Sequence, residues 1–221
     1  MCCKAFPKEI LPERMRLEDG GTERVIFSCR FFGKEKGKMK LQELDIYLAT
    51  LSREDCKTIW NDFEYDFNNP TEELNLGHSD EKADDWFDEI QKLQGNRHIR
   101  LGIYKNDGTV IGDVALQNID RVNRKCSVGI GMAKIGNRGK GYGRQAVMLM
   151  LNYGFMYLGL ERITANTLDI NIGAQKLLEK CGFVLEGRER RSVYLNSEMH
   201  DRLNYAILKE EFSAMEYDKL R

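Results

Sequence analysis

Three glycines at alternate positions, with basic residues beside them, form the segment of this sequence that is best suited to chemistry. The segment reads Arg138-Gly139-Lys140-Gly141-Tyr142-Gly143. Glycine lets the backbone approach a ligand closely and adopt positive φ angles. A helix that begins here would add free amide groups and a partial positive charge. The segment therefore predicts an anion-binding turn, and phosphate is the expected anion.

Positive charge is concentrated at this turn. Arg138, Lys140 and Arg144 lie close together in a chain of 221 residues whose formal net charge is only -1. A flexible loop with solvated charges is the alternative interpretation. The apolar strand before the turn and the long apolar helix after it favour the phosphate site.

The elements around the turn alternate between strands and helices. A strand is expected from Cys126 to Ala133, and the apolar run Ala146–Leu158 is long enough only for a helix. A strand at Arg162–Leu168 follows, and a further helix is expected to begin at Asn171 and to end at Gly182. This order places the glycine turn between a strand and the helix that it opens.

The part of the chain before the turn is typical of two helices and several antiparallel strands. Ser52 fits a helix start, and Ser79 or Asp80 can begin a second helix. Asn106-Asp107-Gly108 predicts a hairpin. Further strands are expected before the turn at 25–32, 44–50, 99–104 and 110–116, and after it at 183–188 and 202–208. The first two of these could form a hairpin across the basic turn Gly33–Lys40.

Length and composition limit the fold class and the partners. The element order predicts a single α+β domain over residues 41–221, with residues 1–40 as an extension that carries an extra strand. The nearly neutral charge argues against nucleic acid as a partner. No apolar run is long enough for a membrane helix, and the start lacks the apolar stretch of a signal peptide. Scattered cysteines and histidines predict no metal site and a reducing, cytoplasmic location.

Two other phosphate-binding motifs fit the turn less well. A Walker-type loop needs a lysine followed by serine or threonine, and Lys140 is followed by glycine. The run from Gly141 to Ala146 matches the dinucleotide pattern G-x-G-x-x-A. The next acidic residue, Glu161, precedes the strand Arg162–Leu168, whereas a ribose-binding acid should lie at the far end of that strand. A nicotinamide-dependent enzyme is therefore the weaker hypothesis.

The turn resembles the pyrophosphate motif of the GNAT acyltransferases, which is Gln or Arg, two residues, Gly, one residue, then Gly or Ala. The run from Asn171 to Phe183 is similar to the family's N-x-x-A-x-x-L helix with its Gly-Phe ending. The tail from Tyr194 to Leu208 resembles the closing hairpin of the RimJ/RimL and spermidine acetyltransferase branch. The resemblance implies a mixed central sheet, mostly antiparallel with one parallel splayed pair, flanked by about four helices.

The resemblance also implies acetyl-CoA as co-substrate and an amine as acetyl acceptor. The strand before the turn would line the pantetheine arm, and the amides of the turn would hold the pyrophosphate. Asn171 would reach the cofactor, cap its helix, or do both. The implied cofactor-binding residues are Gly131, Met132, Ala133, Arg138, Gly139, Lys140, Gly141, Tyr142, Gly143, Arg144 and Asn171.

The sequence departs from the family where relatives carry an acid or a base. Leu178 stands where many relatives have a proton-donating tyrosine, and Ala174 stands where others have serine. The reaction needs a neutral amine and a proton for the leaving thiolate, so another side chain or a water relay must act. Tyr194, His200, Glu64, Tyr65 and Asp66 are the candidates, and a surface or packing role is the alternative for each.

Two functions remain open from the sequence. The first is an acetyl-CoA-dependent N-acetyltransferase whose acceptor is a protein N-terminal amine or a small polyamine-like amine. The second is a non-catalytic acyl-CoA-binding or regulatory protein on the same fold, which the missing tyrosine and serine would explain. The extension 1–40 could cover a sheet edge or form a homodimer contact.

Overall fold

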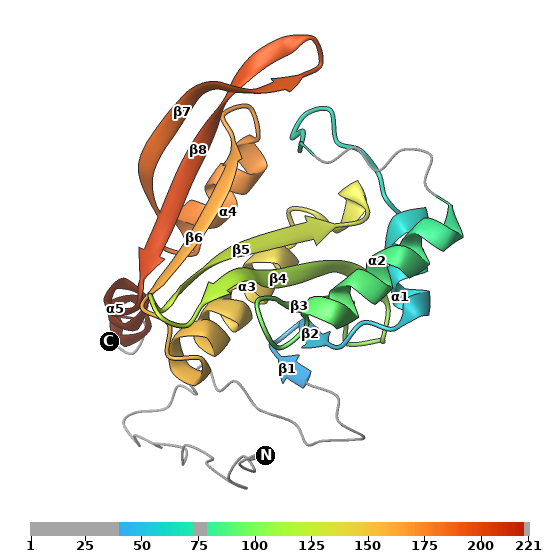
Figure 1. Cartoon of the computed structure of the whole chain (residues 1–221), viewed down its shortest axis with the longest axis horizontal. Helices are drawn as coiled ribbons and strands as arrows, with labels where there is room; N and C mark the ends of the chain where they lie inside the picture. Colours follow the sequence, from blue (N-terminus) through green and yellow to red (C-terminus); the bar gives the residue numbers. More distant parts are fainter. Residues whose placement is uncertain (1–39, 73–78, 219–221) are drawn as a thin grey trace, which may run out of the picture.

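A computed structural model of the protein describes residues 40–72 and 79–218 (Figure 1). The strand expected at 25–32 lies outside the described residues. The described chain forms one mixed sheet with helices on both faces. This agrees with the expected α+β class.

The sheet has the strand order β1-β2-β3-β4-β5-β6-β8-β7. Every neighbouring pair is antiparallel except β5 and β6, which are parallel. One parallel pair in an otherwise antiparallel sheet is the arrangement that the family resemblance implied. The strands are β1 Lys40–Gln42, β2 Ile46–Ala49, β3 Ile99–Lys105, β4 Val110–Asp120, β5 Lys125–Met132, β6 Arg162–Leu168, β7 Val184–Leu195 and β8 Glu198–Leu208.

Helices cover both faces of this sheet (Figure 1). The first two helices pack together on one face, where Cys56, Ile59 and Ile90 form a cluster with Tyr104 of β3. The third runs along the opposite face, and its residues 146–151 are all buried. The helices are α1 Arg53–Asn61, α2 Asp80–Leu93, α3 Tyr142–Asn152, α4 Ile172–Lys180 and α5 Lys209–Asp218.

The main core fixes the start of α3 against β5 and α4. Leu149, Met150 and Leu151 of α3 are almost fully buried in a cluster with the strand residues. At Gly143, a Cβ would lie 3.6 Å from side-chain carbons of both Ile130 and Leu177. Glycine therefore lets three elements meet closely at the point where α3 begins.

Serine residues begin the first two helices, as the sequence predicts. The Ser52 hydroxyl accepts from the Asp55 amide at 3.1 Å, and the Asp55 carboxylate accepts from the Ser52 amide at 2.7 Å. This reciprocal pair is a capping box. Ser79 precedes α2, but its side chain accepts from no amide of that helix.

The structure corrects two expectations about the helices. α3 begins at Tyr142, so the glycine turn opens it as the sequence predicts, but the helix ends at Asn152, earlier than expected. The last apolar residues expected in this helix, Tyr153–Tyr157, form a π turn. α5 was not expected, because Phe212 is the one large apolar residue on its buried side among the side chains described.

The first strands of the sheet also differ from expectation. Tyr47 of β2 is paired with Gln42 on one side and with Tyr104 on the other. A strand has only two edges, so the hairpin expected between 25–32 and 44–50 is wrong. Lys40, which was expected to end a turn, begins β1.

Candidate active site

The parallel strands β5 and β6 separate along their length and leave a gap in the sheet (Figure 1). They pair only where Lys125–Ser127 meets Arg162–Thr164. Beyond this point, β5 stays paired with β4 as far as Met132, and β6 stays paired with β8 as far as Leu168. Within the described chain, the facing edges of the two strands therefore lack a strand partner. An extended ligand could pair with them.

The glycine turn lies at the end of β5, beside this gap. Gly139 and Gly141 have φ angles of 73° and 86°, which glycine adopts without strain. A Cβ on Gly139 would meet no atom within 4 Å, and a Cβ on Gly141 would meet only the Gln145 amide nitrogen at 4.0 Å. The backbone of the turn is therefore open to a ligand.

The first turn of α3 adds free amides to the glycine turn. The amides of Tyr142, Gly143 and Arg144 have no acceptor inside the helix, because no helical carbonyl precedes them. No acidic residue lies in this first turn, and Lys140 is exposed beside it. An open glycine backbone, free amides and a cation fit a pyrophosphate. The Arg144 side chain instead donates to the carbonyl of Lys180 at 3.3 Å.

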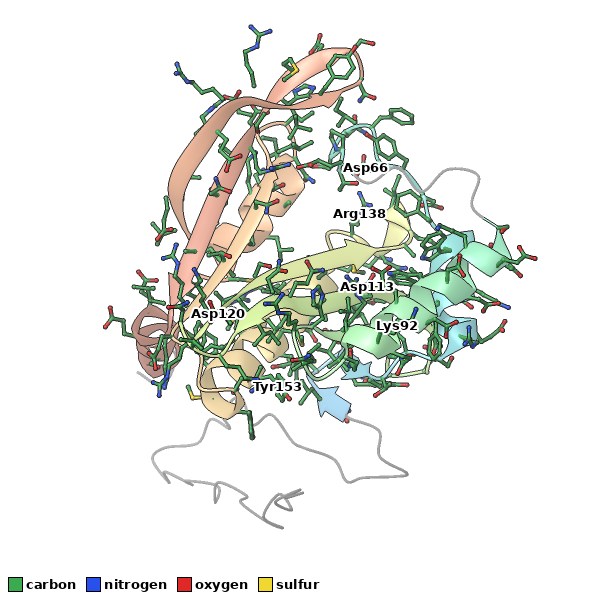
Figure 2. The ribbon with its side chains drawn as sticks, viewed as in Figure 1. Asp66, Lys92, Asp113, Asp120, Arg138 and Tyr153 are labelled. Atoms are coloured by element: carbon green, nitrogen blue, oxygen red, sulfur yellow. The ribbon has the colours of Figure 1, made fainter. Side chains whose placement is uncertain are left out.

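Arg138 is engaged within the protein. Its guanidinium binds the Asp66 carboxylate at 2.8 Å and the Met132 carbonyl at 3.4 Å (Figure 2). Its amide donates to the carbonyl of Ile135 at 2.9 Å. The structure therefore gives Arg138 a role in holding the end of β5. Direct contact with a phosphate stays a prediction.

Asn171 caps α4, which was one of the two roles expected for it; the other was contact with the cofactor. Its side-chain oxygen accepts from the Ala174 amide at 3.0 Å, and its side-chain nitrogen donates to the Pro70 carbonyl at 3.2 Å. The residue is only 7% exposed. Contact of Asn171 with the cofactor remains a prediction.

Residues 64–72, here called the bridging segment, connect the two sides of the gap. The Glu64 amide donates to the Ala133 carbonyl at 2.8 Å, at the end of β5. The Asn69 side chain accepts from the Gly173 amide at 2.8 Å, at the start of α4. Glu72 forms an ion pair with Arg202 of β8 at 2.7 Å. The segment therefore crosses from β5 to the elements that follow β6.

Tyr194 and His200 occupy adjacent register positions in the β7–β8 hairpin, whereas Glu64 lies at the end of β5. Tyr194 is 70% exposed on β7. His200 is half-buried on β8, where its Nε2 lies 3.2 Å from the carbonyl of Leu195. Glu64 alone touches the region of the gap, where its carboxylate accepts from the Ile135 amide at 2.7 Å. Catalytic roles for these side chains remain predictions.

Two further polar groups lie near the gap; Tyr65 was among the candidates from the sequence, and Asp113 was not. Asp113 of β4 stands opposite Gly131 in the strand register and forms a buried ion pair with Arg100. Burial raises the pKa of Asp113, and the Arg100 guanidinium opposes part of this shift. Tyr65 of the bridging segment has a buried hydroxyl that lacks a hydrogen-bond partner within the described residues. No sequence spacing marks Asp113, because its strand register with Gly131 and its ion pair with Arg100 join separate segments.

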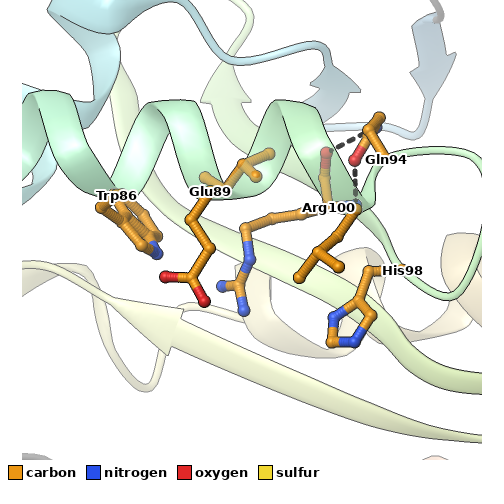
Figure 3. A pocket seen from close by; sticks show the side chains of 7 residues that line it. Trp86, Glu89, Gln94, His98 and Arg100 are labelled. Carbon is orange, nitrogen blue, oxygen red and sulfur yellow. Dashed lines mark hydrogen bonds between the residues drawn. The ribbon is translucent and has the colours of Figure 1, made fainter.

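A small pocket of about 120 Å³ lies between α2 and β3. Side chains of Trp86, Glu89, His98 and Arg100 line it (Figure 3). The Arg100 guanidinium lies 5.5 Å from the ring centre of Trp86, and Asp113 neutralises its charge. Glu89 forms no ion pair with the described residues. The pocket therefore combines an aromatic wall with an unpaired carboxylate on the face that α1 and α2 cover.

Two features are absent from the described residues. No three His, Cys, Asp or Glu side chains gather closely enough to hold a metal ion there. None of the described helices combines the length and the apolar character that crossing a bilayer requires.

A family model described as an acetyltransferase (GNAT) domain matches residues 45–184. The Bacillus subtilis protein YdaF, which is provisionally named a ribosomal N-acetyltransferase, is 34% identical over 58% of this chain and 67% of its own. The spermidine N(1)-acetyltransferase of Vibrio cholerae is 30% identical over 57% of this chain and 75% of its own.

Solved structures show the same fold. A spermidine N-acetyltransferase of Vibrio cholerae in complex with CoA and spermine superimposes with a TM-score of 0.65 and 25% identity. The match covers 76% of this chain and 98% of that one. A dodecameric structure of the Vibrio cholerae enzyme superimposes with a TM-score of 0.62 and 25% identity, over 76% of this chain and 96% of that one. Because the family model matches more than half of the residues, this chain belongs to the GNAT acetyltransferase family.

Proposed function

We propose that the chain transfers the acetyl group of acetyl-CoA to a primary amine. One observation carries the proposal. The open glycine turn, the free amides of α3 and the unpaired edge of β5 lie in sequence along one gap. The turn would hold the pyrophosphate through the amides from Gly139 to Arg144, and the edge at Gly131 and Met132 would hold the pantetheine arm.

The acceptor amine would approach from the face that α1 and α2 cover. α3 buries the other face of β5, where Val128 points. Gly131 is exposed and Gly129 is half-buried, so this side of β5 carries no bulky side chain. An amine is mostly protonated at neutral pH, so it must lose a proton before it attacks the thioester.

Several acidic side chains near this face already form ion pairs with basic side chains of the protein. They are therefore less available to bind a cationic acceptor. Asp84 is bound by Arg53 and Lys57, and Asp66 is bound by Arg138. The unpaired Glu89 carboxylate beside Trp86 is therefore the one that fits a second cationic group of an acceptor. Both a small polyamine-like amine and a protein N-terminal amine remain acceptors to test.

Acetylation assays with release of coenzyme A as readout test the function directly. Polyamines and short peptides with free N-termini serve as acceptors, and turnover of either class identifies the acceptor. Binding of coenzyme A without turnover across the panel would indicate a non-catalytic acyl-CoA-binding protein. Absence of binding would contradict the proposal.

Gly141→Glu tests the site assignment. The new side chain would place a negative charge at the cap of α3, so coenzyme A affinity should fall at least about 100-fold. Gly108→Glu is the matched control, because Gly108 also has a positive φ, of 90°, and open space around it but lies in the β3–β4 turn. Calorimetry should show normal binding by the control. Equal binding by both variants would contradict the assignment.

We also propose a domain organisation and an oligomeric state. Residues 41–221 would form a single acyltransferase domain with residues 1–40 as an extension, and the protein would form a homodimer. Sedimentation distinguishes a monomer of 25.6 kDa from a dimer. Removal of residues 1–39 should leave coenzyme A affinity unchanged if the extension lies outside the domain.

A further inference from the structure

Four basic residues gather where the start of α3 meets α4. Lys140 and Arg144 flank the beginning of α3, and Lys176 and Lys180 belong to α4. All four are exposed, and none forms an ion pair with a described carboxylate. The family resemblance implied Lys140 and Arg144 as cofactor ligands, but it gave no role to the two lysines of α4. Unpaired positive charge therefore extends from the glycine turn onto a second helix.

The contact between α3 and α4 brings these residues to one surface. A Cβ at Gly143 would lie 3.6 Å from a side-chain carbon of Leu177, and the Arg144 Nε donates to the Lys180 carbonyl at 3.3 Å. Residues three and four positions apart share one face of a helix. Lys176 and Lys180 therefore lie on the same face of α4 as Leu177, which packs against the start of α3.

The stability of α4 does not account for both lysines. Lys180 in the last turn interacts favourably with the helix dipole, but Lys176 lies in the middle of the helix. Like charges four positions apart destabilise a helix slightly. Glu179 is the one acidic residue of α4, and it forms an ion pair with neither lysine; together with burial, its charge raises the pKa of Tyr205 in β8. A ligand with several negative charges would relieve the repulsion between the lysines.

Coenzyme A carries a third phosphate that the glycine turn would leave unbound. Its diphosphate is attached to the 5′ position of the adenosine ribose, and a phosphomonoester is attached to the 3′ position of the same ribose. With the pantetheine arm in the gap and the diphosphate at the turn, this ribose would lie outside the gap, beside the turn. A phosphomonoester has a charge of about −1.5 to −2 at neutral pH, and lysine ammonium groups bind it as point charges.

We propose that Lys176 and Lys180, together with Arg144, form a site for the 3′-phosphate of coenzyme A. The site makes the protein select coenzyme A over 3′-dephospho-coenzyme A. This inference rests on the proposed function, because it requires the diphosphate to lie at the glycine turn. It adds a second phosphate site on α4, which neither the glycine turn nor the open edge of β5 provides.

Calorimetry with coenzyme A and 3′-dephospho-coenzyme A tests the site, because the two ligands differ only in the 3′-phosphate. The wild-type protein should bind the dephospho form about tenfold to 100-fold more weakly, since this ligand lacks the charge-assisted bonds to the lysines. The double variant Lys176→Gln, Lys180→Gln keeps residues that favour a helix and removes both charges. It should bind coenzyme A about tenfold more weakly than the wild type does, and the dephospho form within about twofold.

Lys92→Gln is the matched control. Lys92 is also an exposed lysine in the last turn of its helix, but α2 covers the opposite face of the sheet from α3 (Figure 2). This variant should bind both ligands as the wild type does. Retained affinity of the double variant for the dephospho form shows that its fold and its diphosphate site are intact.

Equal wild-type affinity for the two ligands would overturn the 3′-phosphate site and leave the proposed function standing. An equal loss of both affinities in the double variant would also overturn it, because the lysines would then serve the diphosphate or the fold. A loss of coenzyme A affinity in Lys92→Gln as large as that in the double variant would reduce the effect to general charge. Failure of the wild-type protein to bind either ligand would contradict the proposed function and this site together.

Discussion

Asp66 stands at the contact between the bridging segment and the end of β5. Burial by itself would raise the pKa of this carboxyl. Hydrogen bonds from Asn69 and the Asn68 amide, together with the Arg138 guanidinium, outweigh burial and lower the pKa below its usual value. Asp66 therefore stays ionised and keeps Arg138 in place at neutral pH.

The lowered pKa predicts how stability depends on pH. A carboxyl whose pKa is lower in the folded state stabilises the protein above its unfolded pKa of about 3.9, and this contribution is lost as pH falls through the folded value. Asp66→Asn should therefore be less stable than the wild type at pH 7, with a smaller difference at pH 3. Urea unfolding at both pH values measures the free energies.

Glu89→Gln is the control for this experiment, because the Glu89 carboxylate has no ion pair among the described residues. Its free energy of unfolding should follow that of the wild type at both pH values. A difference between Asp66→Asn and the wild type that stays constant between pH 7 and pH 3 would show that Asp66 contributes by packing rather than by charge.

At the scale of the elements, α1 and α2 offer a matched pair of helix starts. Both begin after a serine, but only Ser52 accepts a hydrogen bond from an amide of its helix. A bonded N-cap serine contributes about 1 kcal/mol to stability. The two serines differ in their side-chain partners: Ser52 exchanges bonds with Asp55, whereas Ser79 bonds to the Glu81 side chain.

Ser52→Ala should lower the free energy of unfolding by about 1 kcal/mol, because the Asp55 amide loses its acceptor. Ser79→Ala should change it by less than about 0.5 kcal/mol, because the Ser79 hydroxyl accepts from no amide of α2. Denaturant midpoints at equal slope give both values. Equal losses in the two variants would argue that serine acts at these caps through backbone preference alone.

At the scale of the whole molecule, the sheet consists of two parts joined where β5 and β6 meet. β5 and β6 share three register pairs, whereas β6 and β8 share seven. α3 and the bridging segment add further connections between the two parts. A ligand that pairs with the open edge of β5 would complete the backbone hydrogen bonding that the gap leaves unmade.

Hydrogen exchange tests whether acetyl-CoA completes this edge. Amides of β5 after Ser127 that face the gap should exchange quickly in the free protein and at least tenfold more slowly with saturating acetyl-CoA. The exposed turn at Asn106–Gly108 is the control, because its amides also exchange without unfolding and should not change. Slowing that is equal at both places would contradict direct pairing.

The local sequence was sufficient to predict the features that depend on residues close together in the chain. The glycine turn, the Ser52 cap and the Asn106–Gly108 hairpin were predicted because each requires particular residue types within a few positions. The two GNAT-like motifs also predicted the family and the one parallel strand pair, which the comparisons and the sheet confirm.

The side-chain contacts of the site depended on the tertiary structure. Arg138 was expected at the phosphate, but it binds Asp66, which is 72 positions away in the chain. Asn171 bonds to Pro70 across 101 positions, and Gly173 bonds to Asn69 across 104. Periodicity and spacing report only on neighbours along the chain. The bridging segment, and the unpaired hydroxyl within it, exist only because the fold brings these distant residues together across the gap.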